Sequence, residues 1–201
     1  MKFIGGHPAL DFVNTVSGWS EGTPLEDKLE DFSDLVRWAT AVRLLSPDQA
    51  NGLARLGRNH PRQSFYALAR ARSLRLALYR ILNCLLETEN PKPADLELLQ
   101  KELRIARQHQ ALEAAGRALV WSWGKRTELD SVLWRISQSA ADLLTSNEIV
   151  RLRRCAGETC RWMFLDTSRN HSRQWCDMKD CGNLAKIRRF RARQAQLPGT
   201  R

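Results

Sequence analysis

The sequence predicts a mainly α-helical protein with a small β component, in which a helical N-terminal domain precedes a small zinc-finger module. Apolar residues recur at helical spacing through most of the first three quarters of the chain. No repeated strand-helix-strand pattern is present in the sequence. Four of the five cysteines lie close together near the C-terminus. We therefore expect a helical domain over residues 1–146 and a second module over 147–201, made of a short β-hairpin, a four-cysteine zinc site and a basic helix.

The first sixty residues predict short helices separated by turns. Residues 3–16 mix turn residues with an apolar run, which leaves a strand and a short helix equally open. Thr23-Pro24-Leu25-Glu26 is typical of a helix start, with threonine as the cap and proline in the first turn. Apolar residues at helical spacing follow over 32–42. Ser46-Pro47-Asp48-Gln49 repeats the start signal, and Gly57 can end the helix it opens.

The middle of the chain predicts three longer helices and one hairpin. A long amphipathic helix is expected from about Gln63 to Glu87, and Pro91-Lys92-Pro93 separates it from a helix over 96–106. A hairpin is expected around Gly116. Thr127 is expected to cap a further helix, which Ser146-Asn147 ends.

The charge is concentrated at the C-terminal end. The whole chain has a formal net charge of +10. Residues 151–201 hold 13 Lys/Arg and 4 Asp/Glu, a net of +9, whereas residues 1–150 hold 19 and 18, a net of +1. A basic module on a nearly neutral body indicates an anionic partner, most commonly nucleic acid, although a membrane surface or a solvated face also fits.

The sequence predicts a cytoplasmic protein that does not cross a membrane. The first sixteen residues are too polar for a secretory signal. No run of about 18 apolar residues is found anywhere in the chain. Cytoplasmic thiols stay reduced, which disfavours disulfides between the clustered cysteines. The remaining cysteine, Cys84, lies in an apolar helical stretch and is expected to be a buried hydrophobic residue.

The clustered cysteines form two close pairs. Cys155 and Cys160 are followed, after fifteen intervening residues, by Cys176 and Cys181. Two pairs joined by a short loop allow a chain to surround a tetrahedral ion, and four thiolates suit Zn²⁺. Iron is the chief alternative metal, and His171 between the pairs is an alternative ligand. Four thiolates leave no open coordination position, so we expect one structural zinc per chain rather than a catalytic one.

Basic residues surround and follow this expected zinc site. The helix expected after the last cysteine places Ile187, Phe190 and Leu184 on one face, where they can pack on the zinc site. The other positions are rich in arginine, which suits contacts with phosphates or insertion into a groove of duplex DNA. The candidate nucleic-acid contacts are Arg169, Arg173, Lys186, Arg188, Arg189, Arg191 and Arg193. A charged face that only improves solubility is the alternative.

The segment from Cys155 to Lys186 resembles the bacterial CGNR zinc-finger family. The opening Gly6-His7-Pro8-Ala9-Leu10-Asp11-Phe12-Val13-Asn14-Thr15 resembles the start of the ABATE domain that usually precedes this finger. The resemblance implies a stress-induced transcription regulator whose finger binds DNA, with the same four cysteines as zinc ligands. One position departs from the family pattern, because Leu184 stands where the family has an arginine. That change puts one phosphate contact in doubt and leaves the metal site intact.

The N-terminal domain is a candidate sensor of a small-molecule effector. Several polar side chains interrupt its first apolar run, and buried polar groups need partners. They could line a ligand pocket together with arginines of the long helix, or they could cap turns and satisfy the backbone. The candidate ligand residues are His7, Asp11, Asn14, Arg72 and Arg75.

These patterns favour a zinc-binding, DNA-binding transcription regulator. The alternative is a zinc-stabilised adaptor that binds RNA or protein. Catalysis is not expected, because Gly18-Trp19-Ser20-Glu21-Gly22 matches a nucleophile motif without the strands and following helix that such a motif requires. The sequence leaves open whether the chain forms a homodimer.

Overall fold

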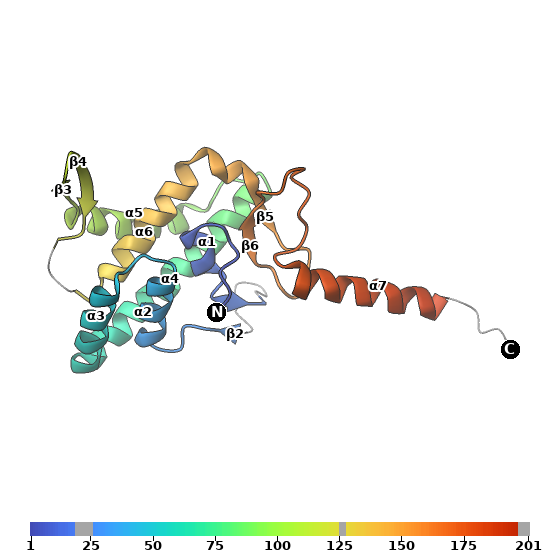
Figure 1. The fold of residues 1–201 in the computed structure, drawn as a ribbon, viewed down its shortest axis with the longest axis horizontal. Coiled ribbons are helices and arrows are strands. Elements are labelled where there is room, and N and C mark those ends of the chain that lie inside the picture. The colour runs from blue at the N-terminus through green and yellow to red at the C-terminus, as the bar shows by residue number, and fades with distance from the viewer. Residues whose placement is uncertain (19–25, 125–127, 197–201) are drawn as a thin grey trace.

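The computed structural model describes residues 1–18, 26–124 and 128–196, and its fold is mainly helical (Figure 1). The helices in the described part are α1 (Pro8–Val13), α2 (Phe32–Ala41), α3 (Pro47–Asn59), α4 (Pro61–Leu86), α5 (Pro93–Gln108), α6 (Ser131–Thr145) and α7 (Asn183–Gln196). A short 3₁₀ helix, η1 (Asn147–Arg151), and a π-helical turn, η2 (Met178–Gly182), complete the helical elements described. The predicted fold class is confirmed.

The strands form three separate antiparallel pairs in the described residues. These pairs are β1 (Val16–Ser17) with β2 (Glu26–Asp27), β3 (Ala111–Ala115) with β4 (Ala118–Ser122), and β5 (Leu152–Arg154) with β6 (Met163–Leu165). The β3–β4 hairpin turns at Gly116, which has a φ of 62°, as the sequence predicts. It lies at one end of the molecule, and α7 projects from the other (Figure 1).

Helix α4 forms the centre of the hydrophobic core. Its residues Leu74, Leu78 and Ile81 are fully buried, and α1, α2, α3, α5 and α6 all contact it. The N-terminal helix α1 is inserted into the same core, where the Phe12 ring lies 5.0 Å from the Trp38 ring of α2. The apolar run near the N-terminus is therefore a short helix followed by a strand, which settles the ambiguity left by the sequence.

Helix α3 has the predicted start but not the predicted end. Ser46 and Gln49 form the predicted reciprocal cap at the start of α3. Gly57 does not end that helix, which continues to Asn59. A Cβ at Gly57 would lie 3.0 Å from the Phe32 ring, so the glycine permits close packing of α3 against α2. The expected termination at Gly57 is therefore wrong, because packing rather than helix capping requires the glycine.

Three predictions lie wholly or partly outside the described residues. Thr23, Pro24 and Leu25 of the expected helix start are not described, and Glu26 lies in β2 instead of a helix. The predicted cap Thr127 is not described, and α6 begins at Ser131. All but the first residue of the Gly18–Gly22 motif is also outside the described part.

The N-terminal segment is hydrogen-bonded to the C-terminal module. The Asn14 side chain accepts from the Met163 N–H at 2.9 Å and donates to the Met163 carbonyl at 2.8 Å. The Trp162 indole N–H donates to the Val16 carbonyl at 2.8 Å, and the Leu165 N–H donates to the Gly5 carbonyl at 2.9 Å. Residues 5–16 therefore position β6, which lies between the two cysteine pairs.

Candidate metal centre and basic helix

The four clustered cysteines come from two loops and one helical turn of the C-terminal module. Cys155 directly follows β5, and Cys160 lies in the loop that leads to β6. Cys176 lies in the loop after β6, and Cys181 lies in η2 immediately before α7. The Cys155 N–H donates to the Trp162 carbonyl at 2.8 Å, which closes the first turn next to the β5–β6 hairpin. The hairpin thus brings the first pair opposite the second.

The sulfur atoms form a cage of the size that zinc requires. All four lie within 4.8 Å of one another. The Cys176 sulfur is 3.5 Å from that of Cys160 and 3.6 Å from that of Cys181. A tetrahedral ion with Zn–S bonds of about 2.3 Å separates its sulfurs by roughly 3.8 Å. These separations are far longer than a disulfide bond of about 2.0 Å. The chain therefore carries one four-cysteine site for a structural zinc ion.

Backbone groups orient the Cys155 sulfur. It accepts hydrogen bonds from the Gly157 N–H at 3.4 Å and from the Cys176 N–H at 3.3 Å. Such N–H donors stabilise negative charge on a metal-bound sulfur. A Cβ at Gly157 would lie 3.3 Å from the Cys181 sulfur and 3.1 Å from the Cys160 Cβ. The first turn therefore needs glycine to pass this close to the cage.

Because the sulfurs lie close together and are partly buried, the pKa of one thiol is lowered and the pKa values of the other three are raised. Hydrogen bonds from Cys160 and Cys176 lower the pKa of Cys155 to about 2, and the contact with Cys155 raises the pKa of Cys160 to about 12. The same contact raises the pKa of Cys176, and burial raises that of Cys181. Four thiolates at this distance repel one another unless a cation lies among them. A divalent ion supplies that charge, and its binding releases protons.

Asp166 organises the loop between β6 and the second cysteine pair. This buried carboxylate accepts from the Ser168 N–H at 2.9 Å, the Ser168 hydroxyl at 2.6 Å and the Arg173 N–H at 3.0 Å. The Ser168 hydrogen bonds lower the pKa of Asp166 from its ordinary value. His171, the alternative ligand, instead places Nδ1 3.2 Å from the Asp166 carbonyl and is not one of the four residues in the cage. The sequence did not single out Asp166, because nothing local marks its role.

Helix α7 begins next to the last cysteine and extends away from the rest of the molecule (Figure 1). All five of its candidate nucleic-acid residues are exposed, namely Lys186, Arg188, Arg189, Arg191 and Arg193. Leu184, Ile187 and Phe190 are also exposed, by 54%, 47% and 63%. The expected packing of these three on the zinc site is therefore not found, because the helix leads outward instead of folding back.

The two candidate arginines of the loop have different environments. Arg169 is exposed. The Arg173 guanidinium stacks on the Phe164 ring at 4.2 Å and donates to the carbonyls of Trp175 and Cys176. Arg173 thus has internal partners that fix the loop next to a zinc ligand. This environment favours a structural role for Arg173 over the predicted contact with nucleic acid.

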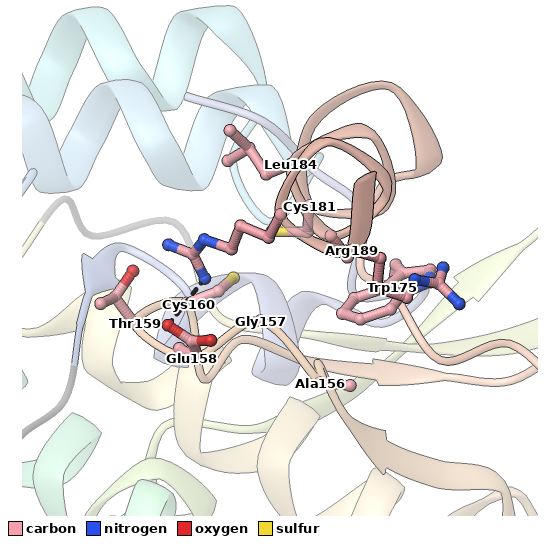
Figure 2. A pocket seen from close by; sticks show the side chains of 11 residues that line it. Ala156, Gly157, Glu158, Thr159, Cys160, Trp175, Cys181, Leu184 and Arg189 are labelled. Carbon is pink, nitrogen blue, oxygen red and sulfur yellow. Dashed lines mark ion pairs between the residues drawn. The ribbon is translucent and has the colours of Figure 1, made fainter. Parts of the chain in front are cut away.

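A cavity of about 300 Å³ lies between the first cysteine turn and the start of α7 (Figure 2). Glu158 and Thr159 lie on one side of it, and Leu184 lies on the other. Glu158 forms an ion pair with Arg188 at 2.8 Å across this cavity. Leu184, the residue that replaces the family arginine, thus lines the cavity without contributing charge.

The five candidate ligand residues have internal partners and do not share any of the cavities described. His7 caps α1, Asp11 accepts from the Gly5 N–H at 2.8 Å, and Asn14 contacts Met163. Arg72 donates to the Leu29 carbonyl. Arg75 donates to the Thr15 hydroxyl and, together with Arg72, pairs with Asp27. In the structure, these side chains therefore have internal partners in caps, backbone groups and one ion pair, and their role as ligand residues stays a prediction.

The fold and the cysteine cage together define a class of protein, a helical domain joined to a four-cysteine zinc finger. Comparison with family models agrees with this class. Residues 6–147 match the ABATE model, described as "Putative stress-induced transcription regulator", and residues 151–194 match the CGNR zinc finger. Because the ABATE match covers well over half of the chain, the protein belongs to the ABATE family. No curated protein matches the chain.

No helix in the described part of the chain has both the length and the apolar content needed to cross a membrane.

Proposed function

We propose that the protein is a transcription regulator that binds duplex DNA through its zinc module and α7. The observation that carries this proposal is the placement of α7, which leaves the cage at Cys181 and presents its cations to solvent. A zinc site next to the first turn fixes the direction of the helix, so its charges are presented as one rigid unit. The family description supports the same function.

The charge balance around the cage favours contact through α7. The four acidic residues between positions 151 and 196 are already engaged: Asp166 by its loop, Asp177 and Asp180 by Lys2, and Glu158 by Arg188. Lys186, Arg189, Arg191 and Arg193 form no ion pair with any residue that the structure describes. Cations free of internal partners can neutralise phosphates and release counterions from DNA. These four residues, with Arg169, are the proposed phosphate contacts.

The affinity for a mixed-sequence DNA duplex, measured by fluorescence anisotropy at several salt concentrations, tests the proposal. We expect affinity to fall as salt rises, and we expect Arg189→Gln and Arg193→Gln each to reduce the salt slope by about 1. Arg55→Gln, at an exposed position of α3, is the matched control and should leave the slope unchanged. Salt-independent binding, or equal slopes in all variants, would contradict the proposal.

Duplex RNA and an acidic protein in the same assay distinguish the regulator from an adaptor. The proposed regulator binds DNA more tightly than either competitor. Tighter binding to RNA, or to the acidic protein, would instead favour the adaptor function.

A further inference from the structure

A second cavity lies at the end of the molecule opposite α7. This open cavity of about 640 Å³ is formed by the end of α5, the end of the β3–β4 hairpin and one face of α6. Its volume is in the range of roughly 300 to 1,000 Å³ that small-molecule sites occupy. The residues that line it are Arg107, Gln110, Trp121, Trp123, Gln138 and Asp142. None of these residues belongs to the candidate ligand set predicted from the sequence.

Two indole rings give this cavity an aromatic wall. Trp121 is 64% exposed on β4, and Trp123 is half-buried just beyond the end of that strand. Leaving an indole largely in water forgoes the free energy that its burial would provide. A planar ring stacked on these side chains would recover part of that free energy. The preferred geometry of aromatic pairs restricts such a ligand to a flat ring system.

A buried cation lies behind the aromatic wall. The Arg135 guanidinium is 5.4 Å from the centre of the Trp123 ring, and the residue is only 7% exposed. Its Nη1 donates to the Ser131 carbonyl at 2.9 Å, and no carboxylate in the described part of the chain pairs with it. Burial lowers the pKa of Arg135 to about 10. A buried charge without a counterion is unfavourable, and an anionic ligand would reduce that cost.

The other polar groups of the cavity fit a carboxylate ligand. Arg107 adds a second, exposed guanidinium, which can bind a carboxylate through two parallel hydrogen bonds. The single acidic residue of the lining, Asp142, already accepts from the Gln138 amide at 2.7 Å. Gln110 donates to Gln138 at 3.4 Å, so the amides form a chain that ends at this carboxylate. Asp142 thus has a hydrogen-bond donor of its own. Arg107 is the cation among the lining residues, and Arg135 lies against the Trp123 ring.

We propose that this cavity binds a planar aromatic carboxylate, and that its occupation changes the DNA affinity of the zinc module. The second half rests on the proposed DNA-binding function. The physical connection is α6, which carries Gln138 and Asp142 and leads through η1 and β5 directly to Cys155. Helix α6 also packs on α1, which contacts β6. A shift of α6 would therefore reach both ends of the β5–β6 hairpin.

Isothermal titration calorimetry of the full-length zinc protein with 2-naphthoate tests the site directly, without DNA. The neutral 2-naphthamide has the same ring system and should bind at least about tenfold more weakly, because charge-assisted hydrogen bonds are lost. Trp121→Ala and Arg107→Gln should each weaken naphthoate binding about tenfold. Both residues are at the surface, so circular dichroism spectra should be unchanged.

Matched controls separate this site from adventitious binding. Leu119→Ala removes an exposed apolar side chain two residues before Trp121, and Arg104→Gln removes an exposed cation from α5. Neither residue lines the cavity. Absence of saturable binding, equal binding of acid and amide, or equal effects of cavity and control variants would overturn the proposal.

The regulatory half is measured by titrating duplex DNA with and without saturating 2-naphthoate. A change of about fivefold or more in DNA affinity is expected from coupled sites. Unchanged DNA affinity together with confirmed naphthoate binding would overturn the regulatory half alone. Absence of DNA binding in the ligand-free protein would refute the proposed function, and the calorimetry would still report on the site.

Discussion

Asn14 is the residue that joins the N-terminal segment most directly to the zinc module. It is 3% exposed, and its amide satisfies both the N–H and the carbonyl of Met163, which lies 149 positions away. The Asn14 amide thus makes the two hydrogen bonds to Met163 that a neighbouring strand would otherwise make with β6. The sequence predicts Asn14 as a ligand residue, and in the structure its amide is occupied by Met163.

We expect Asn14→Ala to lower the free energy of unfolding by about 2 to 4 kcal/mol, because it leaves a buried donor and a buried acceptor without partners. Urea unfolding followed by circular dichroism measures this loss. Asn51→Ala, at an exposed position of α3, is the matched control and should change stability little. Equal losses of stability in the two variants would show that the hydrogen bonds between Asn14 and Met163 contribute nothing.

Asp27 forms an ion pair with a buried arginine of α4, and its own side chain is 22% exposed. It pairs with Arg75, which is 2% exposed, and it also accepts from the Leu29 N–H. Burial by itself would raise the pKa of Asp27, but the hydrogen bonds and charge of Arg75 outweigh it and lower the pKa below the ordinary 3.8. The pair therefore stabilises the fold above about pH 4, and this contribution is lost as pH falls through the folded pKa.

Asp27→Asn should cost about 2 kcal/mol at pH 7, because the buried guanidinium loses its charged acceptor. The difference in thermal unfolding temperature between wild type and variant should be the same at pH 7 and pH 5. This difference should narrow only below pH 4. Glu89→Gln, at an exposed carboxylate, is the control at each pH. If wild type and Asp27→Asn already unfolded at the same temperature at pH 5, the stabilising role of the Asp27–Arg75 pair would be refuted.

Residue roles were predictable from the sequence where the chemistry of a side chain limits its use. Four clustered cysteines have few alternatives to a metal, and the structure brings their sulfurs together. Asn14 and Arg173 can bond to almost any polar group, so their partners depend on which backbone the fold places beside them. That information is not local, so the sequence predicts a ligand role for Asn14 and a nucleic-acid contact for Arg173 without indicating these partners.

At the scale of elements, periodic apolar residues identified the long helices and left the purpose of individual glycines open. Helices α4 and α5 follow the predicted ranges closely, because their apolar faces and flanking prolines act locally. Gly57 was expected to end α3, yet it lies inside the helix against Phe32. The apolar residues of α7 were expected to pack on the zinc site, yet a periodic pattern does not show where a helix axis points.

Gly57→Ala should destabilise the protein by about 1 to 3 kcal/mol, although alanine favours helices, because its Cβ would lie 3.0 Å from the Phe32 ring. Gly52→Ala is the matched control in the same helix. Gly52 borders an open surface cavity, so alanine there should stabilise by up to about 1 kcal/mol. Urea unfolding midpoints decide the result. Stabilisation by both substitutions would mean that α2 and α3 adjust without cost.

At the scale of the whole molecule, the zinc module is in contact with the N-terminal domain. Lys2 pairs with Asp177 and Asp180. Asn14 is hydrogen-bonded to Met163 of β6, and Val16 accepts from Trp162. Arg154 donates to Asn83 and Glu87 at the end of α4. The boundary predicted near Ser146 stays a prediction. The contacts nevertheless show that residues at the start of the chain and residues beyond this boundary stabilise each other.

Removal of zinc should therefore loosen two segments that are far apart in sequence. Four thiols at this distance cannot all ionise without a cation, so a strong chelator should open the cage and release β6. Hydrogen exchange should then increase over residues 152–182 and also over residues 5–16, whose partners lie on β6 and Trp162. The core of α4, α5 and α6 should stay protected.

Native mass spectrometry and hydrogen exchange on the same samples measure both effects. Cys176→Ser should lose the single zinc and show the same pattern as the chelated wild type, whereas Cys84→Ser, outside the cage, should keep the zinc and the protection. If only residues 152–182 lost protection, the N-terminal segment would be held by the helical core alone. Loss in both segments would instead mean that the metal stabilises α1 from a distance, because β6 satisfies its backbone and side-chain partners only while the cage is closed.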